Sequence, residues 1–156
     1  MLERRVSHDA TGLRFCVVAA SWNQQFVSRL VSGALEVLRH RGAADDAIEV
    51  RYVPGSYELP VAAKWAAESG RFDAVLAFGC VIRGETEHFR LVADAASEGL
   101  LRVALDTGVP VLNGVLAAYD AAQAEARSGG DRGNTGSEVA LAAIAMAAQR
   151  REVGVS

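Results

Sequence analysis

The stretch FDAVLAFGCVI, residues 72–82, determines the predicted fold of this chain. It is apolar without interruption, which is typical of a strand buried on both faces of a sheet. Residues 86–106 follow with apolar side chains at helical spacing, and VPVLNGVL at residues 109–116 is a second strand-like run. A strand, a helix and a strand in this order predict a parallel pair joined by a crossover helix.

The same alternation continues on both sides of this unit. Strands are predicted at residues 13–20 and 47–53, and helices at 23–41, 58–69, 119–129 and 137–153, with a glycine-rich turn, GGDRGNTG, at 129–136. The order β-α-β-α-β-α-β-α-α predicts helices on both faces of a parallel sheet. We therefore expect an α/β, flavodoxin-like three-layer sandwich whose four-stranded parallel sheet has the order 2-1-3-4.

Length and composition agree with one globular domain. The chain has 156 residues, of which 51% are hydrophobic and 22% are charged, so it can bury a core of ordinary size. The first twelve residues are polar and lack periodicity. We predict an N-terminal arm at residues 1–12 and a single domain at residues 13–156.

Charge and hydropathy argue against several classes of function. The net charge of −3 argues against nucleic-acid binding and against binding to an anionic membrane surface. No apolar run approaches the ~20 residues that span a bilayer, and the N-terminus lacks the apolar segment of a signal peptide. The sequence therefore predicts a cytoplasmic protein.

The cysteine and lysine content limits the chemistry. Cys16 and Cys80 lie in predicted strands, so we interpret them as buried, reduced side chains, and without further ligands at suitable spacing no metal site is predicted. Lys64 is the one lysine beside 15 arginines, and it lies in a helix-like stretch. A Schiff base on the enzyme is therefore not expected, and any reacting amine must belong to the substrate.

Polar and aromatic side chains lie near the ends of all four predicted strands. In strand order, they are Trp22 after the first, Tyr57 and Glu58 after the second, His88 after the third, and Asn113 near the end of the fourth. In open parallel sheets, ligands bind beyond the carboxyl ends of the strands. We therefore expect these side chains to converge on one ligand site.

Each of these residues also has a structural interpretation. Trp22 either closes the edge of the core or stacks on a planar ligand. Glu58 either suits the start of a helix, where a carboxylate is favoured by the helix dipole, or accepts hydrogen bonds from ligand hydroxyls. Asn113 forms a common turn pair with Gly114 or contacts a ligand, and His88 is either a capping residue or a proton shuttle near neutral pH.

The segment Arg83-Gly84-Glu85-Thr86 precedes a predicted helix. Backbone N–H groups at a helix start bind phosphate, and glycine permits a close approach. Arg127, near the end of a later helix, is either a solvated cation or a clamp on the same phosphate. The residues by themselves thus predict a pocket for a planar, hydroxylated and phosphorylated ligand, but they name no reaction.

Several motifs together carry a resemblance to a known family. They are SWN after the first strand, VPGSYELP after the second, GCVIRGETEHF after the third, VPVLNGVL in the fourth, and an arginine followed by GNTG before the last helix. Over residues 13–150 the chain resembles lumazine synthase, the 6,7-dimethyl-8-ribityllumazine synthase of riboflavin biosynthesis. The resemblance implies a transferase that condenses 5-amino-6-(D-ribitylamino)uracil with 3,4-dihydroxy-2-butanone 4-phosphate. The products are the lumazine, phosphate and water, and neither a metal nor an organic cofactor takes part.

The resemblance also implies roles for individual residues. His88 is implied as the proton-transfer residue in Schiff-base formation and phosphate loss. Arg127 is implied as the phosphate clamp, and the backbone N–H groups of Glu85 and Thr86 as further phosphate ligands. The pyrimidine and its ribityl chain are implied to contact a larger set: Trp22 by stacking, Ser56, Tyr57 and Glu58 around the ring and the ribityl chain, Cys80, Val81 and Ile82 through backbone groups, and Asn113 at the ring.

Some positions depart from the pattern of many family members. Thr135 replaces a lysine in the GNTG turn, and Arg132 is our hypothesis for a substitute. Trp22 stands where phenylalanine is frequent. Asn113 also replaces a phenylalanine, which removes one aromatic wall, but it resembles a subset of the family, so we do not interpret it as a loss of activity.

The resemblance further implies an assembly. Family pockets are shared between adjacent subunits of a homopentamer, with Arg127 supplied by the neighbour of the chain that supplies Trp22, Glu58 and His88. Because the SGGDRGNTG turn has no insertion, we expect an icosahedral 60-mer rather than an isolated pentamer or decamer, with riboflavin synthase as a candidate partner. Three other functions are compatible with the same fold: a divergent synthase with another role, a non-catalytic flavin or lumazine carrier, and a shell protein. The intact histidine, arginine and glutamate favour catalysis over these three.

Overall fold

The core of the protein is a four-stranded sheet. The computed structural model describes residues 5–154, and its sheet is parallel throughout, with the order β2-β1-β3-β4. The strands are β1 (Phe15–Ala20), β2 (Ile48–Val53), β3 (Ala74–Ile82) and β4 (Val111–Ala118). The predicted fold class and strand order are therefore confirmed.

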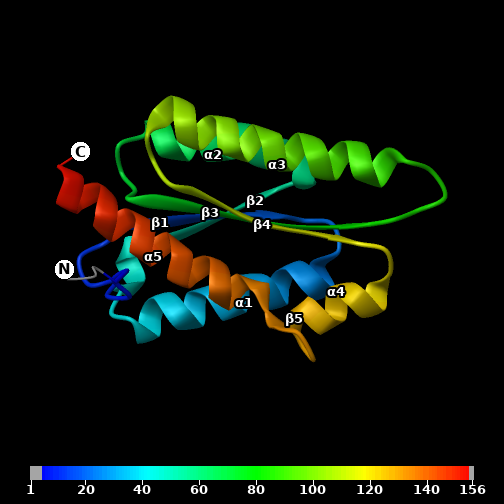
Figure 1. Ribbon diagram of the computed structural model, residues 1–156, viewed down its shortest axis with the longest axis horizontal. Helices are drawn as coiled ribbons and strands as arrows, with labels where there is room; N and C mark the ends of the chain where they lie inside the picture. The colour runs from blue at the N-terminus through cyan, green and yellow to red at the C-terminus, as the bar shows by residue number, and fades with distance from the viewer. Residues whose placement is uncertain (1–4, 155–156) are drawn as a thin grey trace.

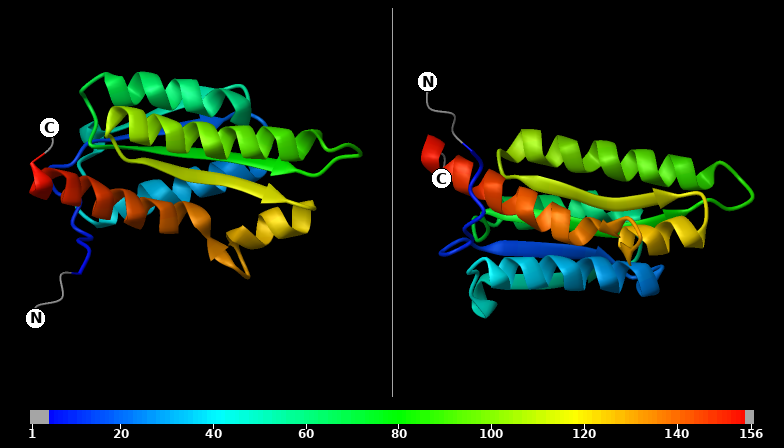
Figure 2. Two further views of the ribbon diagram at one scale, coloured as in Figure 1. Left: turned by 45° about the horizontal axis from the view of Figure 1, so that its top comes forward. Right: turned by 60° about the horizontal axis from the view of Figure 1, so that its bottom comes forward.

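Helices cover both faces of this sheet (Figures 1 and 2). On one face lie α2 (Leu59–Glu68) and α3 (His88–Thr107). On the other lie α1 (Gln24–His40), α4 (Ala121–Arg127) and α5 (Thr135–Val153). Short 3-10 turns at Asp45–Ala47 and Ser56–Glu58 and a small hairpin of β5 (Ser128–Gly130) and β6 (Gly133–Asn134) complete the elements.

The two helical layers bury opposite sides of the same strands. Phe15 and Val17 of β1 face the cluster that α1 and α5 close, whereas Cys16 and Val18 face the cluster under α2 and α3. All four side chains are buried because a central parallel strand is covered on both sides. Burial on both faces is the physical reason why the strands have unbroken apolar sequences.

The last helix begins earlier than the sequence indicated. Asn134 caps α5, since its Oδ1 accepts hydrogen bonds from the backbone N–H groups of Gly136 (2.7 Å) and Ser137 (3.3 Å). Its Nδ2 also donates to the carbonyl of Arg29 on α1 at 3.0 Å. The helix therefore starts at Thr135, and the predicted glycine-rich turn is partly the β5–β6 hairpin.

The described part of the predicted arm packs against the body. Residues 5–10 have no regular secondary structure, but Ala10 is buried in the core and donates its N–H to the carbonyl of Arg41 at 2.9 Å. Residues 1–4 lie outside the described residues. Among residues 5–154, no helix is both long and apolar enough to cross a membrane.

Candidate active site

A cavity of about 260 Å³ lies at the carboxyl edge, the end of the sheet where the strands finish. We call it the carboxyl cavity. The predicted site residues that line it are Trp22, Ser56, Cys80, Val81, Ile82, Thr86 and His88. Asn23, Gly84, Phe89 and Val92 line it as well. Most of the predicted residues are thus brought together, as the carboxyl-end rule for parallel sheets requires.

Trp22 presents its ring to this cavity from the turn after β1. The indole lies against Gly55, where an added Cβ would come within 2.8 Å of two ring carbons. Glu58 fixes the same turn, because its Oε1 accepts the backbone N–H of Gly55 at 2.9 Å. A side chain at position 55 would therefore displace the aromatic ring.

The exit of β3 supplies one wall of the cavity. The carbonyl of Cys80 accepts a hydrogen bond of 2.7 Å from Nδ2 of Asn23, a residue that the sequence did not assign to the site. Burial raises the pKa of the Cys80 thiol to about 11. The thiol is therefore neutral near pH 7 and does not act there as a thiolate nucleophile.

The loop between β3 and α3 brings His88 to the cavity. We expected a helix from Thr86, but α3 begins at His88, after the N-cap residue Glu87. The hydroxyl of Thr86 accepts the backbone N–H of His88 at 3.3 Å, so this N–H is engaged at the helix start. Gly84, Glu85 and Thr86 thus form an exposed loop ahead of the helix, and the predicted phosphate cradle belongs to that loop.

An aromatic cluster fixes this loop to the end of β4. The guanidinium of Arg83 lies 5.1 Å from the ring centre of Tyr119, and Tyr119 lies 6.3 Å from the ring of Phe89. The backbone N–H of Arg83 also donates to the carbonyl of Ala118 at 2.9 Å. Tyr119 was not predicted to be near the site, because the fourth strand was predicted to end at residue 116, whereas β4 ends at Ala118, directly before Tyr119.

Five predicted site residues do not line the carboxyl cavity. One is Glu58, which binds Gly55 in the turn after β2, and four others remain. They are Tyr57, Glu85, Asn113 and Arg127. The placement of Asn113 near the end of the fourth strand was wrong, because it is the third residue of β4 and pairs in register with Ala77. Its amide donates to the hydroxyl of Ser97 on α3 at 3.1 Å. Arg127 ends α4 and donates to the carbonyl of Gln123 at 3.1 Å.

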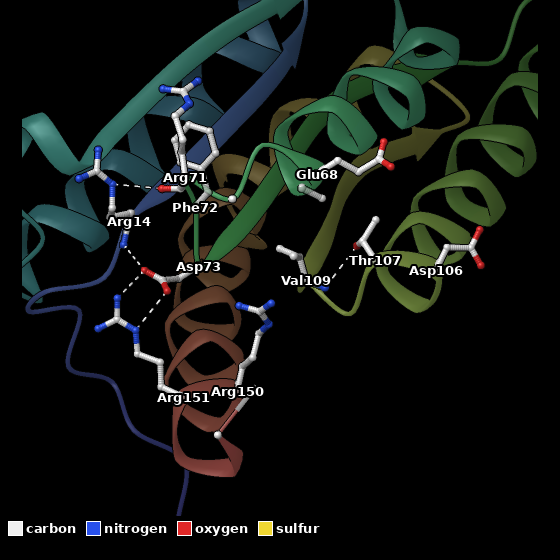
Figure 3. A pocket seen from close by; sticks show the side chains of 13 residues that line it. Arg14, Glu68, Arg71, Phe72, Asp73, Asp106, Thr107, Val109, Arg150 and Arg151 are labelled. Carbon is white, nitrogen blue, oxygen red and sulfur yellow. Dashed lines mark hydrogen bonds and ion pairs between the residues drawn. The ribbon is translucent and has the colours of Figure 1, made fainter. Parts of the chain in front are cut away.

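A larger cavity, of about 810 Å³, lies at the amino edge, the opposite end of the sheet where the strands begin. We call it the amino cavity (Figure 3). Asp73 lies in its wall and accepts hydrogen bonds from the backbone N–H of Arg14 (2.7 Å) and from Nε (3.1 Å) and a terminal nitrogen (2.9 Å) of Arg151. Arg150 donates to the carbonyl of Gly108 at 2.9 Å. These polar groups bind one another, so the size of this cavity is not a sign of ligand binding.

Neither cavity contains a cluster of typical metal ligands. In the part of the chain that the structure describes, no three side chains of His, Cys, Asp or Glu gather closely enough to hold a metal ion. The chemical groups of the carboxyl cavity are instead an indole, an imidazole, hydroxyls and the backbone of β3. These groups suit stacking, proton transfer and hydrogen bonding to a planar polar ligand.

Comparison with known proteins agrees with this arrangement. Residues 12–151 match the family model described as 6,7-dimethyl-8-ribityllumazine synthase. The chain is 52% identical over 134 residues to the protein of that name from Xanthomonas euvesicatoria pv. vesicatoria, covering 86% of this chain and 87% of that one. It is 47% identical over 135 residues to the one from Xylella fastidiosa (strain 9a5c), covering 86% and 88%. The chain therefore belongs to the 6,7-dimethyl-8-ribityllumazine synthase family.

Proposed function

We propose that this protein is a transferase that condenses 5-amino-6-(D-ribitylamino)uracil with 3,4-dihydroxy-2-butanone 4-phosphate. The products are 6,7-dimethyl-8-ribityllumazine, phosphate and water, in the penultimate step of riboflavin biosynthesis. The observation that carries the proposal is the carboxyl cavity, where a stacking ring, a histidine and an open strand exit meet. Membership of the family supports the reaction, and the side chains that line the carboxyl cavity support the proposal that the reaction takes place there.

In this proposal the pyrimidine binds between the exits of β1 and β3. The exposed indole of Trp22 stacks on the ring, and backbone groups of Val81 and Ile82 bind its polar edge. Glu58 and Ser56, in the turn after β2, accept hydrogen bonds from the ribityl hydroxyls. Because Glu58 already binds Gly55 through Oε1, its other oxygen is the one assigned to the ligand.

The butanone phosphate binds next to the loop that precedes α3. The backbone N–H groups of Glu85 and Thr86 bind the phosphate. The amine of the pyrimidine then attacks the ketone and forms an imine, with loss of water. His88 moves the protons that this step and the loss of phosphate require. The reaction needs no lysine from the protein, because the pyrimidine brings the amine.

We further propose that the site is completed by a neighbouring subunit of a homopentamer. Arg127 and Asn113 do not line the carboxyl cavity of their own chain, which supports a contribution to the cavity of a neighbouring copy. Leu91, Leu101 and Leu105 of α3 are all more than half exposed, which supports an interface on this helix. Twelve such pentamers form the 60-mer of the proposal, and light scattering of the purified protein distinguishes it from a pentamer or decamer.

Turnover tests the proposed function directly. We expect purified protein of confirmed assembly size to release phosphate and form a product with lumazine absorbance when both substrates are present. Each substrate alone is the control, because neither gives the lumazine. A correctly assembled protein that forms no lumazine from the two substrates would contradict the proposal.

A further inference from the structure

Asn23 adopts a backbone conformation that asparagine tolerates but does not favour. It is the N-cap residue of α1, with φ 57° and ψ 43°, and among residues 5–154 it is the one non-glycine residue in the left-handed region. Such a residue persists where its surroundings hold it, and these positions concentrate at functional sites. The contacts of the Asn23 side chain are therefore expected to hold this backbone conformation.

Comparison with a second capping asparagine shows what is unusual. Asn134, at the start of α5, has an extended backbone, and its side chain accepts hydrogen bonds from the first N–H groups of the helix. The side chain of Asn23 makes no capping bond to α1. It donates instead to the carbonyl of Cys80 at 2.7 Å, so it binds strand β3 and does not cap its own helix.

The carbonyl of Cys80 needs this partner because β3 extends beyond its neighbour β1. The register between the two strands ends at Ala19 and Phe78, so later groups on that side of β3 have no strand to bind. Successive residues of a strand direct their backbone groups to opposite sides. The backbone groups of Ile82 therefore point to the same side of β3 as those of Cys80, two residues beyond the carbonyl that binds Asn23. Ile82 also borders the carboxyl cavity.

The turn that carries Asn23 is also fixed to the exit of β2. The backbone N–H of Ser21 donates to the carbonyl of Val53 at 2.8 Å, and that of Trp22 donates to Pro54 at 3.3 Å. These bonds place the indole over Gly55. The turn after β1 is thus held to β2 by its backbone and to β3 by the side chain of Asn23.

We propose that Asn23 is a positioning residue of the carboxyl cavity: its amide holds the exit of β3 against the turn that carries Trp22, so that the indole and the backbone of Ile82 are presented together to the pyrimidine. The proposal rests on the function proposed above for the same cavity. It assigns Asn23 no chemical step, because its amide is used in binding Cys80.

Two substitutions separate this role from folding stability. Asn23→Gly removes the amide but favours the left-handed backbone, so stability is expected to stay near that of the wild type. Asn23→Asp keeps the shape and suits a helix start, but a carboxylate has no N–H to donate to Cys80. Gln24→Ala is the matched control, because Gln24 also donates its amide to a strand-end carbonyl, that of Ala20 at 2.9 Å, but does not line the cavity.

The first measurement is steady-state kinetics together with thermal unfolding. We expect both Asn23 variants to raise the KM for the ribitylaminouracil about fivefold to tenfold, the effect of one misplaced hydrogen-bonded contact. The KM for the butanone phosphate and the unfolding temperature of Asn23→Gly should stay near the wild-type values. Gln24→Ala should leave both KM values unchanged.

The second measurement does not depend on activity. In a Trp65→Phe background, Trp22 is the remaining tryptophan, and its fluorescence anisotropy reports how firmly the indole is held. We expect Asn23→Gly to lower this anisotropy and Gln24→Ala to leave it unchanged. If the wild type makes no lumazine, the proposed function fails while the anisotropy still decides the role of Asn23. Unchanged anisotropy together with an unchanged uracil KM in Asn23→Gly would overturn the inference.

Discussion

The amino and carboxyl edges of the sheet both carry a cavity with polar side chains, but the polar groups of the two cavities are used differently. At the amino edge, Asp73 accepts three hydrogen bonds from Arg14 and Arg151, and Arg150 binds a helix-end carbonyl (Figure 3). At the carboxyl edge, within residues 5–154, the imidazole of His88 and the indole of Trp22 make no hydrogen bond or ion pair of their own.

This difference shows why cavity size is a poor guide to function here. The amino cavity is larger, but its arginines lie near the carboxyl ends of α2, α3 and α5, where cations offset the helix dipoles and bind free carbonyls. The carboxyl cavity is smaller, but the imidazole of His88 and the indole of Trp22 remain available to a ligand. Charged groups that bind each other stabilise the fold, whereas polar groups left without a partner mark a candidate site.

Substitution of one arginine from each edge gives the largest expected contrast. Arg127→Ala should raise the KM for the butanone phosphate about 30-fold to 150-fold, because a charge-assisted clamp contributes ~2–3 kcal/mol. Arg150→Ala, at the amino cavity, should leave that KM unchanged, because its guanidinium binds the carbonyl of Gly108. Steady-state kinetics on both variants checks the contrast. A KM that does not change in Arg127→Ala would remove Arg127 from the phosphate site.

The second contrast compares two substitutions at the amino cavity by their effect on the free energy of unfolding. Asp73→Ala should lower the free energy of unfolding by about 2–3 kcal/mol, because it leaves the N–H of Arg14 and the guanidinium of Arg151 without their partner. Asp106→Ala is the matched control in the same cavity, since its exposed pair with Arg102 is worth less than about 0.5 kcal/mol. Urea unfolding at one fixed protein concentration measures both. Equal losses in the two variants would show that Asp73 is not the centre of this network.

The parts of the fold that follow from periodicity were predictable from the sequence. The apolar run at β3 and the helical spacing after it predicted the layers, because burial on both faces leaves a continuous signal, whereas the strand order was predicted from the flavodoxin-like topology. Helix starts were less predictable. The shift of α3 to His88 depends on the hydroxyl of Thr86 and that of α5 on the cap at Asn134, which are local hydrogen bonds without a periodic pattern.

The site was predictable where residues directly follow a strand, and less so elsewhere. Trp22 and His88 were found because the carboxyl-end rule directs attention to these loops. Asn113 was misplaced because the fourth strand runs two residues further than predicted, to Ala118. Asn23 was missed because a left-handed backbone and a bond to a distant strand leave no trace in local sequence.

Histidines at the two edges give a smaller contrast. His88→Ala should lower kcat about tenfold. This is less than the ~10²–10⁴-fold that is usual for acid–base catalysis, because groups of the substrates also transfer protons. His40, in the last turn of α1, lies outside the carboxyl cavity, so His40→Ala should leave kcat unchanged. Single-turnover measurements separate the chemical step from product release. Equal kcat values in the two variants would place proton transfer elsewhere than His88.

The smallest expected effect is a pH dependence of stability at the amino edge. The hydrogen bond from Arg51 (2.8 Å), with a second from Arg71 (3.0 Å), lowers the pKa of Glu49 below its ordinary value. Because the folded pKa is the lower one, this stabilisation is complete above the unfolded pKa and is lost as the pH falls through the folded value. The unfolding temperature of the wild type should therefore exceed that of Glu49→Gln near pH 7, and the difference should shrink toward about pH 3. A difference that stays constant over this range would show that the carboxylate charge of Glu49 adds nothing to the folded state.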